Sequence, residues 1–207
     1  GVQLDEMASD DFGRFQTNQI KPRWLNSQSA FLQPAADEFW LVAAANFNFE
    51  WMGTTVSIQP VAQNNQYTVY QVQNREADET AVTHALILNS NQIELLTTLL
   101  DVVSQEGVIH LTSRWQNETG PVPLKIYVHL LDESGQIVSQ WDGLGIAWEG
   151  WRSGDSLWQQ HELRIPAPLP VGKYQLRVGL YDPETAVRWQ TATGEDFVEL
   201  STIEVEP

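Results

Sequence analysis

Two pairs of carboxylates are the first residues in this sequence that could do chemistry: Asp142 with Glu149, and Asp155 with Glu162. Glycoside hydrolysis uses two carboxyl groups that face each other across a cleft, roughly 5–9.5 Å apart. Nothing in the spacing of either pair directs both side chains into one pocket, and acidic residues beside glycine commonly cap turns. We therefore predict no catalytic residues and no enzymatic activity within this chain.

The remaining polar residues do not form a recognisable metal or cofactor motif. His110 and His129 could meet across neighbouring strands, but zinc needs a third ligand and the sequence has no cysteine. No glycine-flanked serine elbow and no phosphate-binding loop is present. Two acidic turns offer hard oxygen ligands that suit calcium, without the spacing of a dedicated calcium loop; they are Asp132-Glu133-Ser134 and Asp182-Pro183-Glu184. We predict no metal site and no cofactor.

Tryptophans are the strongest positive signal, with nine in 207 residues. Sugars pack their C–H faces on aromatic rings, while their hydroxyls pair with charged and amide side chains. One glycine-rich stretch combines both kinds of residue, and its candidate carbohydrate-binding residues are Trp141, Asp142, Trp148, Glu149, Trp151 and Arg152. The alternative is that these tryptophans pack against the first half of the chain or a larger parent protein. Trp115 and Trp189 are expected to fill the core.

Short apolar runs elsewhere in the sequence are expected to form the strands that position this tryptophan-rich stretch. Residues 124–130 and 174–181 alternate between apolar and polar side chains, which is typical of strands with one buried face. Residues 93–103 are ambiguous, since their length suits a short helix while their paired threonines and valines favour a strand. The predicted fold is mainly β: an antiparallel immunoglobulin-like or jelly-roll-like sandwich preceded by a smaller β-rich region.

Composition limits the partners and the organisation of the chain. A net charge of −16 repels phosphate backbones, so we predict no nucleic-acid partner. The charged segment 74–81 marks the expected boundary between a smaller region, 1–78, and a sandwich, 79–207. The apolar run 40–45 is far shorter than the ~20 residues of a membrane helix. The chain starts with glycine and shows no signal peptide, so we expect it to be part of a longer protein.

The second half contains short sequence motifs whose order matches a known pattern. Trp115 precedes Tyr127-Val128-His129-Leu130-Leu131-Asp132 with Gly135 behind it, and then come Gln140-Trp141-Asp142 and Trp151-Arg152-Ser153-Gly154-Asp155. The last phrase is Gly172-Lys173-Tyr174-Gln175-Leu176-Arg177-Val178-Gly179-Leu180-Tyr181-Asp182. Over about residues 91–190, this order resembles the C-terminal extracytoplasmic β-sandwich of bacterial membrane glycosyltransferases of the dolichyl-phosphate-mannose protein mannosyltransferase type.

The resemblance implies a role outside catalysis. In that family the catalytic aspartates lie near the first membrane helices, and no position of this sequence matches them. The implied function is a non-catalytic accessory module of a larger membrane-anchored envelope protein, located outside the cytoplasm. The implied partners are a glycan or lipid-linked sugar and the membrane-embedded remainder of the parent protein. The alternative function is a free-standing carbohydrate-binding module that uses the tryptophan-rich loop.

Overall fold

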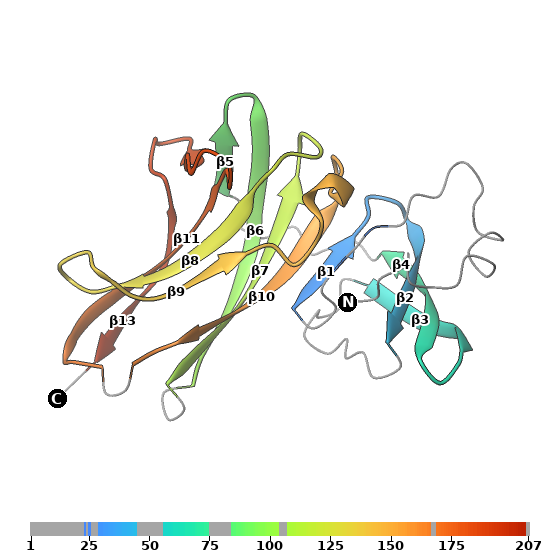
Figure 1. Ribbon diagram of the computed structural model, residues 1–207, viewed down its shortest axis with the longest axis horizontal. Coiled ribbons are helices and arrows are strands. Elements are labelled where there is room, and N and C mark those ends of the chain that lie inside the picture. Colours follow the sequence, from blue (N-terminus) through green and yellow to red (C-terminus); the bar gives the residue numbers. More distant parts are fainter. Residues whose placement is uncertain are drawn as a thin grey trace.

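The computed structural model describes Arg23, Leu25 and residues 29–44, 56–74, 84–103, 107–166 and 169–205. In these parts of the chain the strands form three sheets, and the strand pairs are antiparallel (Figure 1). Two of the sheets share one apolar core, and the third is a small sheet formed by residues that precede them in the sequence. The predicted mainly-β sandwich with a smaller β-rich region before it is therefore confirmed.

The sandwich consists of a six-stranded and a four-stranded sheet. The six-stranded sheet has the order β1 (Ala30–Gln33), β10 (Ser156–Arg164), β7 (Val108–Asn117), β6 (Asn91–Val103), β5 (His84–Leu88) and β12 (Gln190–Thr191). The four-stranded sheet has the order β13 (Val198–Val205), β11 (Gly172–Tyr181), β8 (Lys125–Leu131) and β9 (Ile137–Gly143). The ambiguous segment 93–103 is thus a strand, because β6 pairs with both β5 and β7.

Alternation of side chains builds the core between these two sheets. Along β7, every second residue from Ile109 to Asn117 is buried, as expected for a strand with one face against the core. Trp115 and Trp189 are fully buried in the core between the two sheets, which confirms the prediction that they fill it. Each buried aromatic side chain of this size contributes several kcal/mol, since truncation of a core tryptophan costs about 3–5 kcal/mol.

A third layer covers the outer face of the six-stranded sheet at its β1 edge. The small sheet has the order β2 (Glu38–Ala44), β4 (Tyr67–Asn74) and β3 (Val56–Gln63). Ala30 and Leu32 of β1 point into the sandwich core, whereas Phe31 points the other way. Phe31 and Trp158 of β10 form a second core with Leu41, Ala43, Val56 and Val72 of the small sheet. Figure 1 shows β1 between the sandwich and this small sheet.

The predicted boundary between residues 78 and 79 lies outside the described residues. On its N-terminal side, β1 belongs by sequence to the region 1–78, yet it pairs with β10 as an edge strand of the sandwich. The two predicted regions therefore share a sheet, and their division at 78/79 stays a prediction. In the described part of the chain, no helix has the length and apolar character needed to cross a membrane.

Candidate functional site

The structure separates the six residues of the predicted sugar-binding loop into three places. Trp151 is only 1% exposed, and its indole N–H donates to the backbone oxygen of Asp155 at 3.0 Å. Trp141 and Asp142 are adjacent on β9, so their side chains lie on opposite faces of the sheet. The ring of Trp141 packs against the sandwich core, whereas Asp142 lies at the outer face beside His129.

The other three loop residues remain at the surface. Trp148 is half-buried and Glu149 is exposed, both in the 3₁₀ turn η3 (Trp148–Gly150), and Arg152 is exposed after it. Gly145 anchors the start of the loop, because its N–H donates to Gln159 Oε1 at 2.7 Å and a Cβ there would lie 2.6 Å from that oxygen. The loop therefore has one partly exposed tryptophan, Trp148, which is followed by the exposed Glu149 and Arg152. Sugar binding by the predicted set stays a prediction.

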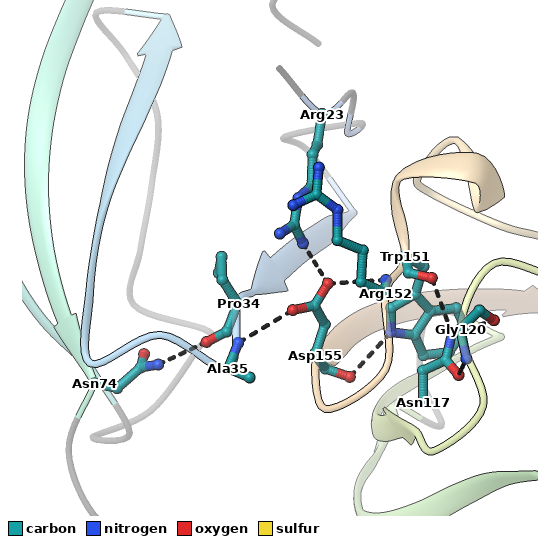
Figure 2. A network of polar contacts seen from close by, with 9 residues as sticks. All are labelled: Arg23, Pro34, Ala35, Asn74, Asn117, Gly120, Trp151, Arg152 and Asp155. Atoms are coloured by element: carbon teal, nitrogen blue, oxygen red, sulfur yellow. Dashed lines mark hydrogen bonds and ion pairs between the residues drawn. The ribbon is translucent and has the colours of Figure 1, made fainter. Parts of the chain in front are cut away.

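Asp155 is a buried carboxylate that joins the sandwich to the link between β1 and β2. It is 2% exposed, and its oxygens accept hydrogen bonds from the backbone N–H of Ala35 at 3.1 Å and of Arg152 at 2.9 Å. The guanidinium of Arg23 forms an ion pair with the same carboxylate. Figure 2 shows these donors converging on Asp155 from both sides. A carboxylate with this many donors serves as a structural tie.

Two asparagines extend this tie on either side (Figure 2). Asn117 donates to the backbone oxygens of Gly120 and Trp151 at 2.9 and 3.0 Å, and it is 1% exposed. Asn74, at the end of β4, donates to the oxygens of Pro34 and Ala36 at 2.7 Å each. Polar side chains that could bind ligands elsewhere are therefore used here to hold loops and the small sheet in place.

Of the two carboxylate pairs considered from the sequence, Asp155 and Glu162 do not form a glycosidase-like site. Asp155 precedes β10, and Glu162 lies exposed within that strand, 3.1 Å from Arg164. Seven residue steps of about 3.3 Å each place Asp155 and Glu162 roughly 23 Å apart along the strand, well beyond the separation that glycoside hydrolysis needs. Asp142, the first member of the other pair, lies 3.6 Å from His129 Nε2.

A serine and a histidine meet inside the sandwich, which sequence reasoning did not anticipate. Ser113 Oγ lies 2.7 Å from His161 Nε2 and also accepts the indole N–H of Trp115 at 2.7 Å. A serine beside a histidine can form an activated nucleophile, but only where substrate reaches it. Ser113 and His161 are 0% and 2% exposed, and burial lowers the pKa of His161 to about 3. The pair is therefore a core hydrogen-bond network. It arises from the pairing of β7 with β10, which local sequence does not reveal.

The outer face of the four-stranded sheet holds a cluster of aromatic and basic side chains. Tyr127 of β8 lies across Gly179 of β11, and its hydroxyl donates to the backbone oxygen of Asp196. The guanidinium of Arg188 lies 4.6 Å from the centre of the Tyr127 ring. Burial, partly offset by the Arg188 charge, raises the pKa of Tyr127 to about 12. The Tyr127 side chain is therefore held in place and uncharged at pH 7.

His129 stands beside Tyr127 on this face. Their ring centres are 4.6 Å apart, and Asp142 Oδ2 lies 3.6 Å from His129 Nε2. Burial lowers the pKa of His129, and the neighbouring Asp142 carboxylate only partly offsets that effect. His129 is therefore neutral at pH 7 and able both to donate and to accept hydrogen bonds. Within the described residues, no group of three or more histidine, cysteine or acidic side chains is placed to hold a metal ion.

Substituting Gly179 by alanine is expected to displace the Tyr127 ring. A Cβ at this position would lie 2.5 Å from Tyr127 Cζ, so ring or strand must shift, at a cost of about 1–3 kcal/mol in unfolding free energy. Ultraviolet titration should then show one tyrosine ionising closer to pH 10. Gly150→Ala is the control, since its Cβ meets Arg23 only at 3.4 Å. An unchanged tyrosine titration in Gly179→Ala would show that the ring is not held in this way.

Comparison with protein-family models finds no match to this sequence, and comparison with curated proteins finds none either.

Proposed function

We propose that this chain is a non-catalytic accessory module of a larger membrane-anchored envelope protein, a glycosyltransferase of the kind its second half resembles. The observation that carries the proposal is that buried polar side chains bond to other parts of the chain. Asp155 joins the loop before β10 to the β1–β2 link, and Asn74 ties that link to the small sheet. Groups that an enzyme would present to substrate here hold the loop before β10, the β1–β2 link and the small sheet together.

The position of the resembling phrases also supports the proposal. The phrases 127–132 and 172–182 form the paired strands β8 and β11, with Tyr127 opposite Gly179. They thus build one surface of the sandwich, on which Tyr127, His129 and Arg177 are neighbours. A rigid module with such a surface is suited to orienting a glycan or lipid-linked sugar outside the cytoplasm, beside a membrane-embedded catalytic part.

Reading the coding sequence on both sides of this chain tests the proposal directly. We expect several apolar segments of ~20 residues encoded in the same open reading frame, as a membrane-embedded parent requires. Deleting the whole of this chain, residues 1–207, from that parent should then reduce sugar transfer while the membrane part still folds. A frame that encodes only a secreted protein without such segments would overturn the proposal, and so would a deletion that leaves transfer unchanged.

A second candidate, a free-standing carbohydrate-binding module, is favoured by the partly exposed Trp148, which shares a surface turn with Glu149 and is followed by the exposed Arg152. On a glycan array, the chain should then bind a defined set of glycans, and Trp148→Ala should lose them. Trp40→Ala is the matched control, because Trp40 is 60% exposed on β2, outside the loop. Binding that Trp148→Ala retains, or that Trp40→Ala equally loses, would exclude the loop as the site.

A further inference from the structure

A small pocket lies on the outer face of the four-stranded sheet, away from the tryptophan-rich loop. Its volume is about 210 Å³. Strands β8 and β11 form its base, and the walls come from the β8–β9 hairpin and from the segments before and after β12. The lining side chains fall into a polar and an apolar group: His129, Arg177 and Arg188, and Leu131, Ile137 and Phe197.

Arg177 differs from the other charged groups around this pocket because it has no carboxylate partner among the described residues. Arg188 Nη1 pairs with Asp196 Oδ2 at 3.0 Å, and Asp142 lies beside His129. Arg177 donates to the neutral amide oxygen of Gln175 at 2.5 Å, and its Nε is buried without a hydrogen-bond partner in the described part of the chain. An arginine left in this state is costly, since a buried charged donor normally finds an acceptor.

The guanidinium of Arg177 is also held in a defined orientation. Its central carbon lies 3.9 Å from the centre of the Phe197 ring, a stacked cation–π contact. Stacking covers one face of the planar group and leaves its N–H donors directed sideways, in the geometry that binds carboxylate or phosphate oxygens. In a chain with a net charge of −16, a positive side chain at a pocket without an ion-pair partner among the described residues is suited to an anionic ligand.

The rest of the lining indicates what carries the anion. Pockets for drug-sized ligands usually measure roughly 300–1,000 Å³, so a pocket of about 210 Å³ accommodates a single ring or terminal group. Ile137 is 47% exposed and lines the pocket from the β9 edge, while Phe197 lines it from the β13 edge. Neutral His129 provides a hydrogen-bond partner for hydroxyl groups. A polyhydroxylated ring with one negative group matches this combination.

We propose that this pocket binds a monosaccharide carrying one anionic group, free or as the terminal unit of a glycan, with Arg177 holding the anion and the apolar side chains of Ile137 and Phe197 packing against the ring. This site is separate from the tryptophan-rich loop, and it does not depend on the accessory role. The anion is a carboxylate, as in a uronic acid, or a phosphate on a sugar.

Titration of the intact chain at low ionic strength, followed by calorimetry or NMR, tests this site. The probes are glucuronate, glucose 6-phosphate, glucose and acetate. We expect at least one of the two anionic sugars to bind saturably, with glucose and acetate each at least tenfold weaker. The stronger of the two anionic probes identifies carboxylate or phosphate as the anion. Equal binding of glucose, equal binding of acetate, or no binding of either anionic sugar would overturn the proposal.

Variants then assign the anion to its residue. Arg177→Met, which keeps the length and removes the charge, should weaken binding about tenfold to a hundredfold, as expected for loss of a charge-assisted hydrogen bond. Arg164→Met is the matched control, an exposed arginine on β10 whose removal should change nothing. Ile137→Asp is a second variant that leaves Arg177 intact and places a repelling charge at the pocket wall. Binding retained in both Arg177→Met and Ile137→Asp would contradict the site.

Discussion

Replacing Asp155 by alanine is expected to lower the free energy of unfolding by about 3 kcal/mol or more, the usual cost of removing one partner from a buried, hydrogen-bonded ion pair. The substitution leaves three donors without their acceptor: the backbone N–H groups of Ala35 and Arg152, and the guanidinium of Arg23. Urea unfolding followed by tryptophan fluorescence measures the loss, and Trp151, bonded to the backbone of Asp155, reports on this region.

The matched control for this prediction lies in the same part of the molecule. Asp37 is an exposed aspartate in the β1–β2 link, and only its backbone oxygen has a described hydrogen bond, from Asn74. Asp37→Ala should therefore stay within about 0.5 kcal/mol of the wild type. If Asp155→Ala were as stable as Asp37→Ala, the carboxylate would not join the two parts of the fold. A loss of about 3 kcal/mol in Asp155→Ala, with Asp37→Ala close to the wild type, would assign the effect to the buried Asp155 carboxylate.

The fold was predictable because strand alternation is a local property of the sequence. The residues 174–181 alternate strictly, and they form most of β11 with Tyr174, Leu176 and Val178 buried. Segment 93–103 lacked such a clear pattern, and its state is decided by pairing with β5 and β7 on either side. The position of β1 beside β10 joins residues more than a hundred positions apart, which no local pattern encodes.

The candidate sites were harder to predict from the sequence, because tertiary contacts decide which side chains are buried. Trp148 and Trp151 look equivalent in the sequence, but only Trp151 has a core to fill and a backbone oxygen to bond. Arg177 and Phe197 are unremarkable in their own segments and meet through the pairing of β11 with β13. The available signal was chemical: Arg177 and His129 are polar residues inside otherwise regular strands, on the face opposite the core.

His161 is a second buried group with a large expected effect, this time on the pH dependence of stability. Its Nε2 lies 2.7 Å from Ser113 Oγ, and the same oxygen accepts the Trp115 indole N–H. Its other ring nitrogen, Nδ1, is buried and has no hydrogen-bond partner among the described residues. Trp141 packs edge-on at a centre-to-centre distance of 4.3 Å, so the imidazole is enclosed by apolar groups. An additional proton would place a charge in this core without any counter-ion.

Burial consequently lowers the pKa of His161 to about 3, against 6.5 for the free side chain. Between these two values the unfolded chain binds a proton that the folded chain does not. Its contribution to stability is complete above pH 6.5 and is lost as the pH falls toward 3, by about 1.4 kcal/mol for each pH unit. Two units below 6.5, the wild type should therefore have lost nearly 3 kcal/mol through this residue alone.

Comparison of wild type with His161→Gln isolates this contribution, because the carboxylates and His129 titrate in both proteins. Their difference in unfolding free energy, measured by urea denaturation between pH 7 and pH 4.5, should shrink as the pH falls and follow the slope above. His84→Gln is the control, since His84 is exposed on β5 and its removal should leave the wild-type pH dependence in place. A difference between wild type and His161→Gln that is constant over this range would mean that water or an acceptor reaches Nδ1 and that His161 takes up a proton in the folded state.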